Sequence, residues 1–212
     1  MALVAVANPK GGVGKSTLAT NIAGYYASRG HAVALGDVDG QQSARWWLGE
    51  RPQVARTIQL WEATPDWIGR PPRDVAHAVL DTPAGLQGWR LKDVLRKADR
   101  IVVPLQASVF DIFATRQFLD DLQALRIDTS AQIGIVGMRV DERTIAADKL
   151  HAFVNELGLP VLGFLRNTQN YVHLAAHGLT LFDIAPARVA RDLEQWQPLC
   201  TWLDEAGGLS PR

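Results

Sequence analysis

The stretch that decides the fold of this chain is Lys10-Gly11-Gly12-Val13-Gly14-Lys15-Ser16-Thr17. An apolar run at residues 3–7 precedes it, and residues 17–27 are typical of a helix. Strand, glycine-rich loop and helix in this order are the setting of a phosphate-binding loop. The glycines let backbone N–H groups turn toward an anion, and the helix N-terminus adds its positive dipole end. The stretch therefore predicts a nucleotide site; the alternative is a glycine-rich turn with two solvated lysines.

Each residue of the loop is expected to contact a particular part of the bound nucleotide. Backbone N–H groups of the loop, at Gly11, Gly12, Val13 and Gly14, would form the cradle. Lys15 would reach the β- and γ-phosphates, Ser16 would offer its hydroxyl to Mg²⁺, and Thr17 would bond the α-phosphate. Pro9 stands where the generic pattern has glycine, which argues against an ordinary loop with one lysine.

Composition limits the classes of protein that this chain can belong to. A chain of 212 residues with 47% hydrophobic content favours one domain over residues 1–212. The net charge is zero, so contact with DNA would need a local basic patch. Cys200 is the single cysteine, which excludes a disulfide framework within the chain. Met1 leads directly into the first apolar run and no run reaches membrane-spanning length, so we expect a cytoplasmic protein.

Short apolar runs alternate with helical segments along the chain. They lie at residues 3–7, 31–35, 57–61, 75–80, 101–105, 133–138 and 161–165. This alternation predicts an α/β P-loop fold, with a mostly parallel, twisted sheet and helices on both faces. A last helix at about 187–206 has an apolar side for packing, and its acidic residues would be repelled by an anionic membrane. These are Asp192, Glu194, Asp204 and Glu205, which we expect outside the apolar side.

Two aspartates fall at the ends of predicted strands. Asp39 lies 24 positions after Lys15, and Asp81 closes the run at residues 75–80. Ligands of such folds bind at the carboxyl ends of the strands, where the glycine loop also lies. One carboxylate can hold Mg²⁺ while the other orients the attacking water. Either aspartate alone could be a helix cap or turn residue, but beside the loop we expect both to be functional.

These motifs together resemble those of the ParA/MinD superfamily of deviant Walker A ATPases. The loop resembles its deviant Walker A box, residues 37–43 its Walker A′ segment, and residues 79–84 its Walker B strand. Leu165-Arg166-Asn167 resembles the late Pro-Arg-Asn element near the adenine. The similarity runs from residue 2 to about 185 and is strongest to short plasmid-partition proteins of the ParF type. Gly36, Gly40 and Leu165 depart from the family pattern, but none of them removes a charged group from the chemistry.

The resemblance implies a role for each matching residue. Lys10 would cross a dimer interface to the partner's ATP, Asp39 would lie near the hydrolytic water, and Asp81 would be the Walker B residue. Arg166 and Asn167 would lie near the adenine. ATP and Mg²⁺ would then hold together a homodimer that loosens on hydrolysis.

The resemblance also implies partners. The ATP dimer would bind non-specific DNA on the nucleoid, without a membrane, and an adaptor of the ParB type or a cargo-linked equivalent would stimulate hydrolysis. The candidate DNA contacts are basic residues at the start of the last helix and near the sixth strand: Arg188, Arg191, Arg139, Arg143 and Lys149. Dimerisation would double such a patch and make binding depend on ATP.

Two other functions are weighed against this one. A small-molecule phosphoryl-transfer enzyme on the same fold would need a substrate pocket and no DNA. A reductase resembling the nitrogenase iron protein would need four cluster cysteines from a dimer, and one cysteine per chain does not supply them.

Overall fold

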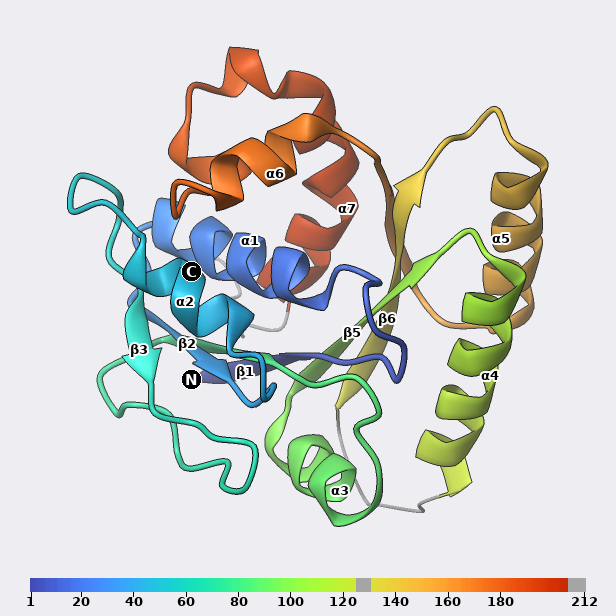
Figure 1. The fold of residues 1–212 in the computed structure, drawn as a ribbon, viewed down its shortest axis with the longest axis horizontal. Helices are drawn as coiled ribbons and strands as arrows, with labels where there is room; N and C mark the ends of the chain where they lie inside the picture. The colour runs from blue at the N-terminus through green and yellow to red at the C-terminus, as the bar shows by residue number, and fades with distance from the viewer. Residues whose placement is uncertain (125–130, 206–212) are drawn as a thin grey trace.

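A computed structural model describes residues 1–124 and 131–205, and a seven-stranded parallel sheet lies at its centre (Figure 1). The strands lie in the order β3-β2-β4-β1-β5-β6-β7, and all the paired strands run parallel. Their bounds are β1 (Ala2–Val6), β2 (Val33–Asp37), β3 (Gln59–Trp61), β4 (His77–Asp81), β5 (Arg100–Gln106), β6 (Gln132–Val140) and β7 (Val161–Arg166). The predicted α/β fold is confirmed.

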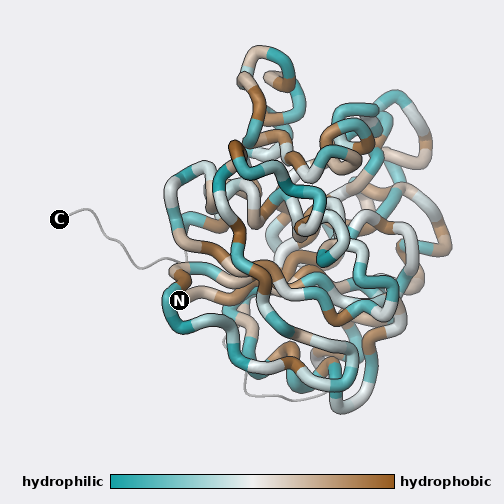
Figure 2. Tube along the Cα trace, turned by 60° about the vertical axis from the view of Figure 1, so that its left-hand side comes forward, coloured by the Kyte–Doolittle hydropathy of each residue, from teal (hydrophilic) through white to brown (hydrophobic). Residues whose placement is uncertain are grey.

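Helices cover both faces of the sheet because alternate strand residues point to opposite sides. Val4 and Val6 pack under α1 (Lys15–Ser28), α2 (Ser43–Gly49), α6 (Gln169–Ala175) and α7 (Ala190–Glu205). Leu3 and Ala5 pack under α3 (Gly88–Lys97), α4 (Val109–Ala124) and α5 (Ile145–Glu156). Two 3₁₀ helices, η1 (Leu181–Asp183) and η2 (Pro186–Arg188), join α6 to α7. Figure 2 shows apolar stretches in the interior and hydrophilic stretches in the outer turns.

The order of the strands fixes where a ligand can bind. β1 lies between β4 and β5, and the chain builds the sheet first on one side of β1 and then on the other. At such a switch point the loops after neighbouring strands diverge and leave a crevice at their carboxyl ends. The phosphate loop and Asp39 lie in the loops after β1 and β2, and Asp81 is the last residue of β4.

The last helix differs from its prediction in two ways. Val189, with φ −131° and ψ 23°, separates η2 from α7, so the α-helix begins at Ala190, and residue 206 lies outside the described residues. Asp192 was expected away from the apolar side, yet it is fully buried. The carboxylate can be buried because it accepts hydrogen bonds from Arg166 and Asn170, and these offset the loss of its hydration. Among the described helices, none has the length and apolarity needed to cross a membrane.

Candidate nucleotide-binding site

The phosphate loop has a backbone that two of its glycines make possible. Gly12 and Gly14 have φ values of 76° and 99°, in the left-handed region that favours glycine. A Cβ on Gly14 would lie only 2.7 Å from Cε of Met138 on β6. The loop is thus held in its curved form and packed against a neighbouring strand, with α1 beginning directly after it at Lys15.

Lys15 is positioned at the mouth of this loop although it is almost fully buried, with 7% of its surface exposed. Its Nζ donates a hydrogen bond of 2.7 Å to the carbonyl oxygen of Lys10. Burial lowers the pKa of Lys15, and the charges of Asp81 and Asp39 oppose that shift. The ammonium group is therefore held where the charges of both strand-end carboxylates act on it.

The surroundings of Asp81 indicate whether the site fits a divalent cation. It ends β4, is 1% exposed, and neither carboxylate oxygen makes a hydrogen bond of good geometry with a described residue. Burial raises its pKa to about 7, while the nearby Ser16 hydroxyl and the Lys15 charge act in the opposite direction. Mg²⁺ prefers carboxylate, hydroxyl and phosphate oxygens, so the free lone pairs of Asp81 beside Ser16 fit this ion.

Asp37 and Asp39 order the segment after β2. Asp37 is buried and accepts hydrogen bonds from the backbone N–H groups of Asp39, Ala44 and Arg45 at 2.9, 2.8 and 3.2 Å. Burial raises the pKa of Asp37, and these three hydrogen bonds partly offset the shift. Asp37 thus fixes the start of α2 and leaves Asp39 half-exposed at the site. The place of Asp37 in the motif was evident from the sequence, but its role in holding the start of α2 was not.

Residues 8–10 form a short arm that carries Lys10, and it is held by Asn8, to which the sequence assigned no structural role. Asn8 is buried, and its Nδ2 donates to the carbonyl of Pro104 at 2.7 Å and to Oγ1 of Thr115 at 3.0 Å. Its Oδ1 accepts from the Lys10 N–H at 2.8 Å. The Lys10 ammonium itself makes no ion pair within residues 1–124 and 131–205.

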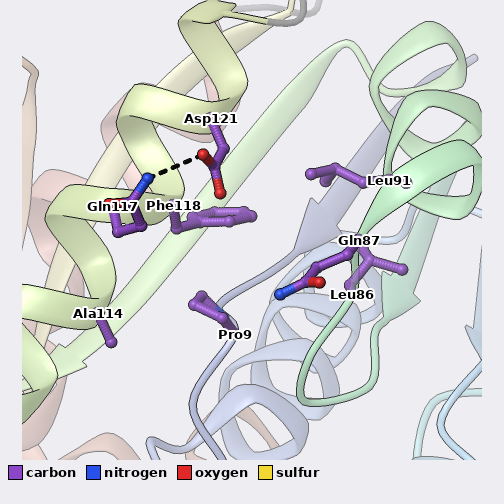
Figure 3. A pocket seen from close by; sticks show the side chains of 9 residues that line it. Pro9, Leu86, Gln87, Leu91, Ala114, Gln117, Phe118 and Asp121 are labelled. Atoms are coloured by element: carbon purple, nitrogen blue, oxygen red, sulfur yellow. Dashed lines mark hydrogen bonds between the residues drawn. The ribbon is translucent and has the colours of Figure 1, made fainter.

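A cavity of about 500 Å³ lies beside this arm, between α3 and α4. Figure 3 shows Pro9 on one side of it, with Leu86 and Leu91 facing Phe118 and Asp121 across the gap. The carbonyl of Pro9 accepts a hydrogen bond of 2.8 Å from the Gly85 N–H, so the loop after β4 is joined to the arm. The arm that carries Lys10 is therefore joined to the loop after β4 and, through Asn8 and Thr115, to α4.

A second cavity, of about 410 Å³, adjoins the phosphate loop on its other side. Gly14 and Thr17 line it together with the segment from Arg166 to Thr168, so Arg166 and Asn167 share one cavity with the phosphate loop. Nε of Arg166 donates to Oδ1 of Asp192 at 2.6 Å, and its backbone N–H donates to Oε1 of Gln195 at 2.9 Å. The volume of this cavity is in the range of small-molecule sites.

The candidate DNA contacts are dispersed. Arg188 and Arg191 are exposed on η2 and the first turn of α7, on one face of the sheet. Lys149 is exposed on α5, on the other face, and Arg143 is paired with Asp141 at 2.9 Å. Arg139 lines the cavity next to Arg166. Arg188 and Arg191 therefore lie together at the start of the last helix, and Lys149 lies on the opposite face of the sheet.

Comparison with known proteins places the chain in a family. The model of the CobQ/CobB/MinD/ParA nucleotide binding domain matches residues 4–181. The chain belongs to this family. It is 30% identical over 186 residues to maintenance of carboxysome distribution protein A of Gloeobacter kilaueensis, covering 85% of this chain and 84% of that protein. It is 31% identical over 184 residues to the chromosome-partitioning ATPase Soj of Thermus thermophilus, covering 70% of this chain and 74% of Soj.

The fold agrees with that membership. The solved complex of a Cyanothece McdA variant with ATP superimposes with a TM-score of 0.76 and 16% identity, covering all of this chain and 98% of McdA. The family and the arrangement of the phosphate loop with Asp39 and Asp81 are those of an ATPase.

Proposed function

We propose that this ATPase is an ATP-dependent dimerising switch for DNA partition or the positioning of an intracellular cargo. The observation that carries the proposal is the second lysine. Lys15 already serves the phosphate loop of its own chain, whereas Lys10 lies at the very start of the loop, and its ammonium forms no ion pair with the described residues. A cation in that position suits the nucleotide of a facing copy, so that ATP joins two subunits related by a two-fold axis.

The contacts of Lys15 supply a route from nucleotide binding to the dimer. Its Nζ is bonded to the Lys10 carbonyl, and a phosphate oxygen is a stronger acceptor than a carbonyl. On nucleotide binding, Lys15 would give up this hydrogen bond and bind a phosphate instead. The arm would then keep the hydrogen bond between the Lys10 N–H and Asn8 but lose the one to Lys15. Bound Mg²⁺ would neutralise developing charge on the phosphates, with Ser16 and Asp81 as its ligands. Asp39 would orient the attacking water.

The partners in this proposal are non-specific DNA and a stimulating adaptor. Arg188 and Arg191 form a small exposed basic pair, and a dimer would present it twice. Doubling the number of neutralised phosphates steepens the dependence on salt, so DNA binding would follow ATP binding. The relatives named above include a carboxysome-distribution protein and a chromosome-partitioning ATPase, which supports a cytoplasmic, nucleoid-associated role with an adaptor of the ParB type or a cargo-linked equivalent.

One observation favours the alternative, a small-molecule phosphoryl-transfer enzyme. A further cavity of about 530 Å³ adjoins the phosphate loop at Ser16 and Thr17, and Trp46 and Trp47 line its other side. Its volume is in the range of small-molecule sites. A substrate there would lie beside the proposed Mg²⁺ ligand Ser16 and would need no DNA.

The experiment that separates these functions measures DNA binding and molar mass with ATP, ADP or no nucleotide at several salt concentrations. We expect dimers and DNA binding with ATP alone. Lys15→Ala should lose nucleotide binding, Lys10→Ala should bind ATP but remain monomeric, and Lys92→Ala on α3 serves as the matched lysine control. DNA binding that is independent of nucleotide would refute the switch, and no DNA binding under any condition would favour the alternative.

A further inference from the structure

We infer that Arg139 is a nucleotide-binding residue whose guanidinium stacks on the base of the bound nucleotide. This inference rests on the proposed nucleotide site and reassigns a residue that the sequence placed on a DNA-binding surface. It is carried by the backbone of Arg139, by its place in the cavity beside the phosphate loop, and by the charges around it.

The backbone at Arg139 is unusual. Its φ of 54° lies in the left-handed region, which among the described non-glycine residues only Gln42 shares. A residue other than glycine, asparagine or aspartate rarely takes this conformation, and such positions cluster at functional sites. The pairing of β6 with β7 is irregular at this point, between Met138 and Val140.

The neighbours of Arg139 hold that conformation in place. Met138 and Val140 are each 4% exposed, and Met138 packs against Gly14 of the phosphate loop. The chain is therefore anchored on both sides of Arg139, while Arg139 itself is exposed at the carboxyl end of the strand. The unfavourable backbone conformation of Arg139 therefore lies directly beside the phosphate loop.

The charges in the cavity set Arg139 apart from Arg166. The Arg166 guanidinium is neutralised by Asp192, which is fully buried, at 2.6 Å. Arg139 makes no hydrogen bond or ion pair through its side chain within the described parts of the chain, and the lining includes no acidic residue. The remaining polar lining is neutral, with Asn167, Thr168 and Tyr171. Among the described residues that line this cavity, Arg139 is thus the cation that has no acidic partner.

The place of Arg139 in the cavity favours contact with the base of the nucleotide over contact with its phosphates. Gly14 and Thr17 mark the phosphate end, where Lys15 and the loop N–H groups already supply positive charge. Arg139 lines the same cavity as Asn167 and Thr168, whose amide and hydroxyl suit the edge of a base. A planar guanidinium stacks on an aromatic face, which an ammonium group does less well.

The test measures the affinity for ADP by calorimetry, so that hydrolysis plays no part. Arg139→Asn removes the guanidinium while asparagine tolerates the left-handed backbone. Arg139→Lys keeps the positive charge but loses the planar guanidinium group. We expect both variants to bind ADP about 3- to 30-fold more weakly than the unaltered protein. Arg143→Asn, a matched exposed arginine on the same connection, should bind ADP normally, and the preference for ADP over UDP should shrink in both Arg139 variants.

Each other result overturns the inference in a recognisable way. Full affinity in Arg139→Lys would mean that charge alone matters and that the guanidinium does not stack. Full affinity in Arg139→Asn together with weaker DNA binding would return Arg139 to the DNA surface. Failure of the unaltered protein to bind ADP would refute the nucleotide site itself, and thermal melting without nucleotide identifies any variant that has merely unfolded.

Discussion

Arg166 and Asp192 are joined by a hydrogen bond of 2.6 Å between Nε and Oδ1, with the carboxylate fully buried. The second oxygen of Asp192 accepts from Nδ2 of Asn170, also at 2.6 Å. Asp192 belongs to α7, whereas Arg166 ends β7 and Asn170 lies on α6. One carboxylate therefore holds both ends of the connection between β7 and α6, which lines the cavity beside the phosphate loop.

Replacing Asp192 by alanine should lower both stability and nucleotide affinity. The substitution removes the buried carboxylate that accepts from the half-buried donors of Asn170 and Arg166, and a hydrogen bond to a charged group contributes about 1.5–3 kcal/mol. Urea denaturation should show that loss, and ADP binding should weaken because the segment from Arg166 to Thr168 is released. Glu194→Ala, on an exposed position of the same helix, should change stability by less than about 0.5 kcal/mol. Equal effects of the two substitutions would contradict the role of Asp192.

Sequence reasoning identified the parts of the site whose function lies in short motifs. The phosphate loop, Asp39 and Asp81 were found because glycines, a lysine and strand-end carboxylates stand at fixed spacings. Asp192 was misassigned because a helical pattern separates polar from apolar positions and carries no information on a partner 26 residues away. The contact of Asn8 with Thr115, 107 residues apart, left no local pattern either. The left-handed backbone of Arg139 depends on how β6 meets β7 and Gly14, which is set by tertiary packing.

Asn8→Ala should uncouple the Lys10 arm from α4. The side chain of Asn8 bonds the Lys10 N–H, the Pro104 carbonyl and the Thr115 hydroxyl, and alanine leaves all three unpaired. We expect a stability loss of about 1–3 kcal/mol and weaker ATP-dependent dimerisation than in the unaltered protein. Molar mass measured across a range of ATP concentrations reports the second effect. Thr115→Val removes one of the three contacts and should give a smaller change in the same direction.

Gly14→Ala should abolish nucleotide binding with little effect on the rest of the fold. The φ of 99° is unfavourable for any side chain, and the added Cβ would meet Met138 at 2.7 Å, so the loop must move. Gly49→Ala is the matched control, because its Cβ would enter open space and its φ is not positive. Calorimetric ADP binding should be lost in the first variant and kept in the second. ADP binding by Gly14→Ala at normal affinity would show that the loop does not need this conformation.

The stability of the nucleotide-free protein should fall as the pH rises toward neutrality because of Asp81. Its pKa is raised from 3.8 to about 7 by burial, so between these values the folded state holds a proton that the unfolded state has lost. The stabilising contribution is therefore complete below about pH 4 and disappears as the pH passes 7, with a total of a few kcal/mol. Asp81→Asn cannot titrate, so its urea midpoint should vary less over this range than that of the unaltered protein. The affinity for Mg²⁺ and ATP should rise over the same range, since a metal ligand must be deprotonated. Parallel pH profiles of stability in the two proteins would show that Asp81 ionises normally and that its burial does not prepare it for the cation.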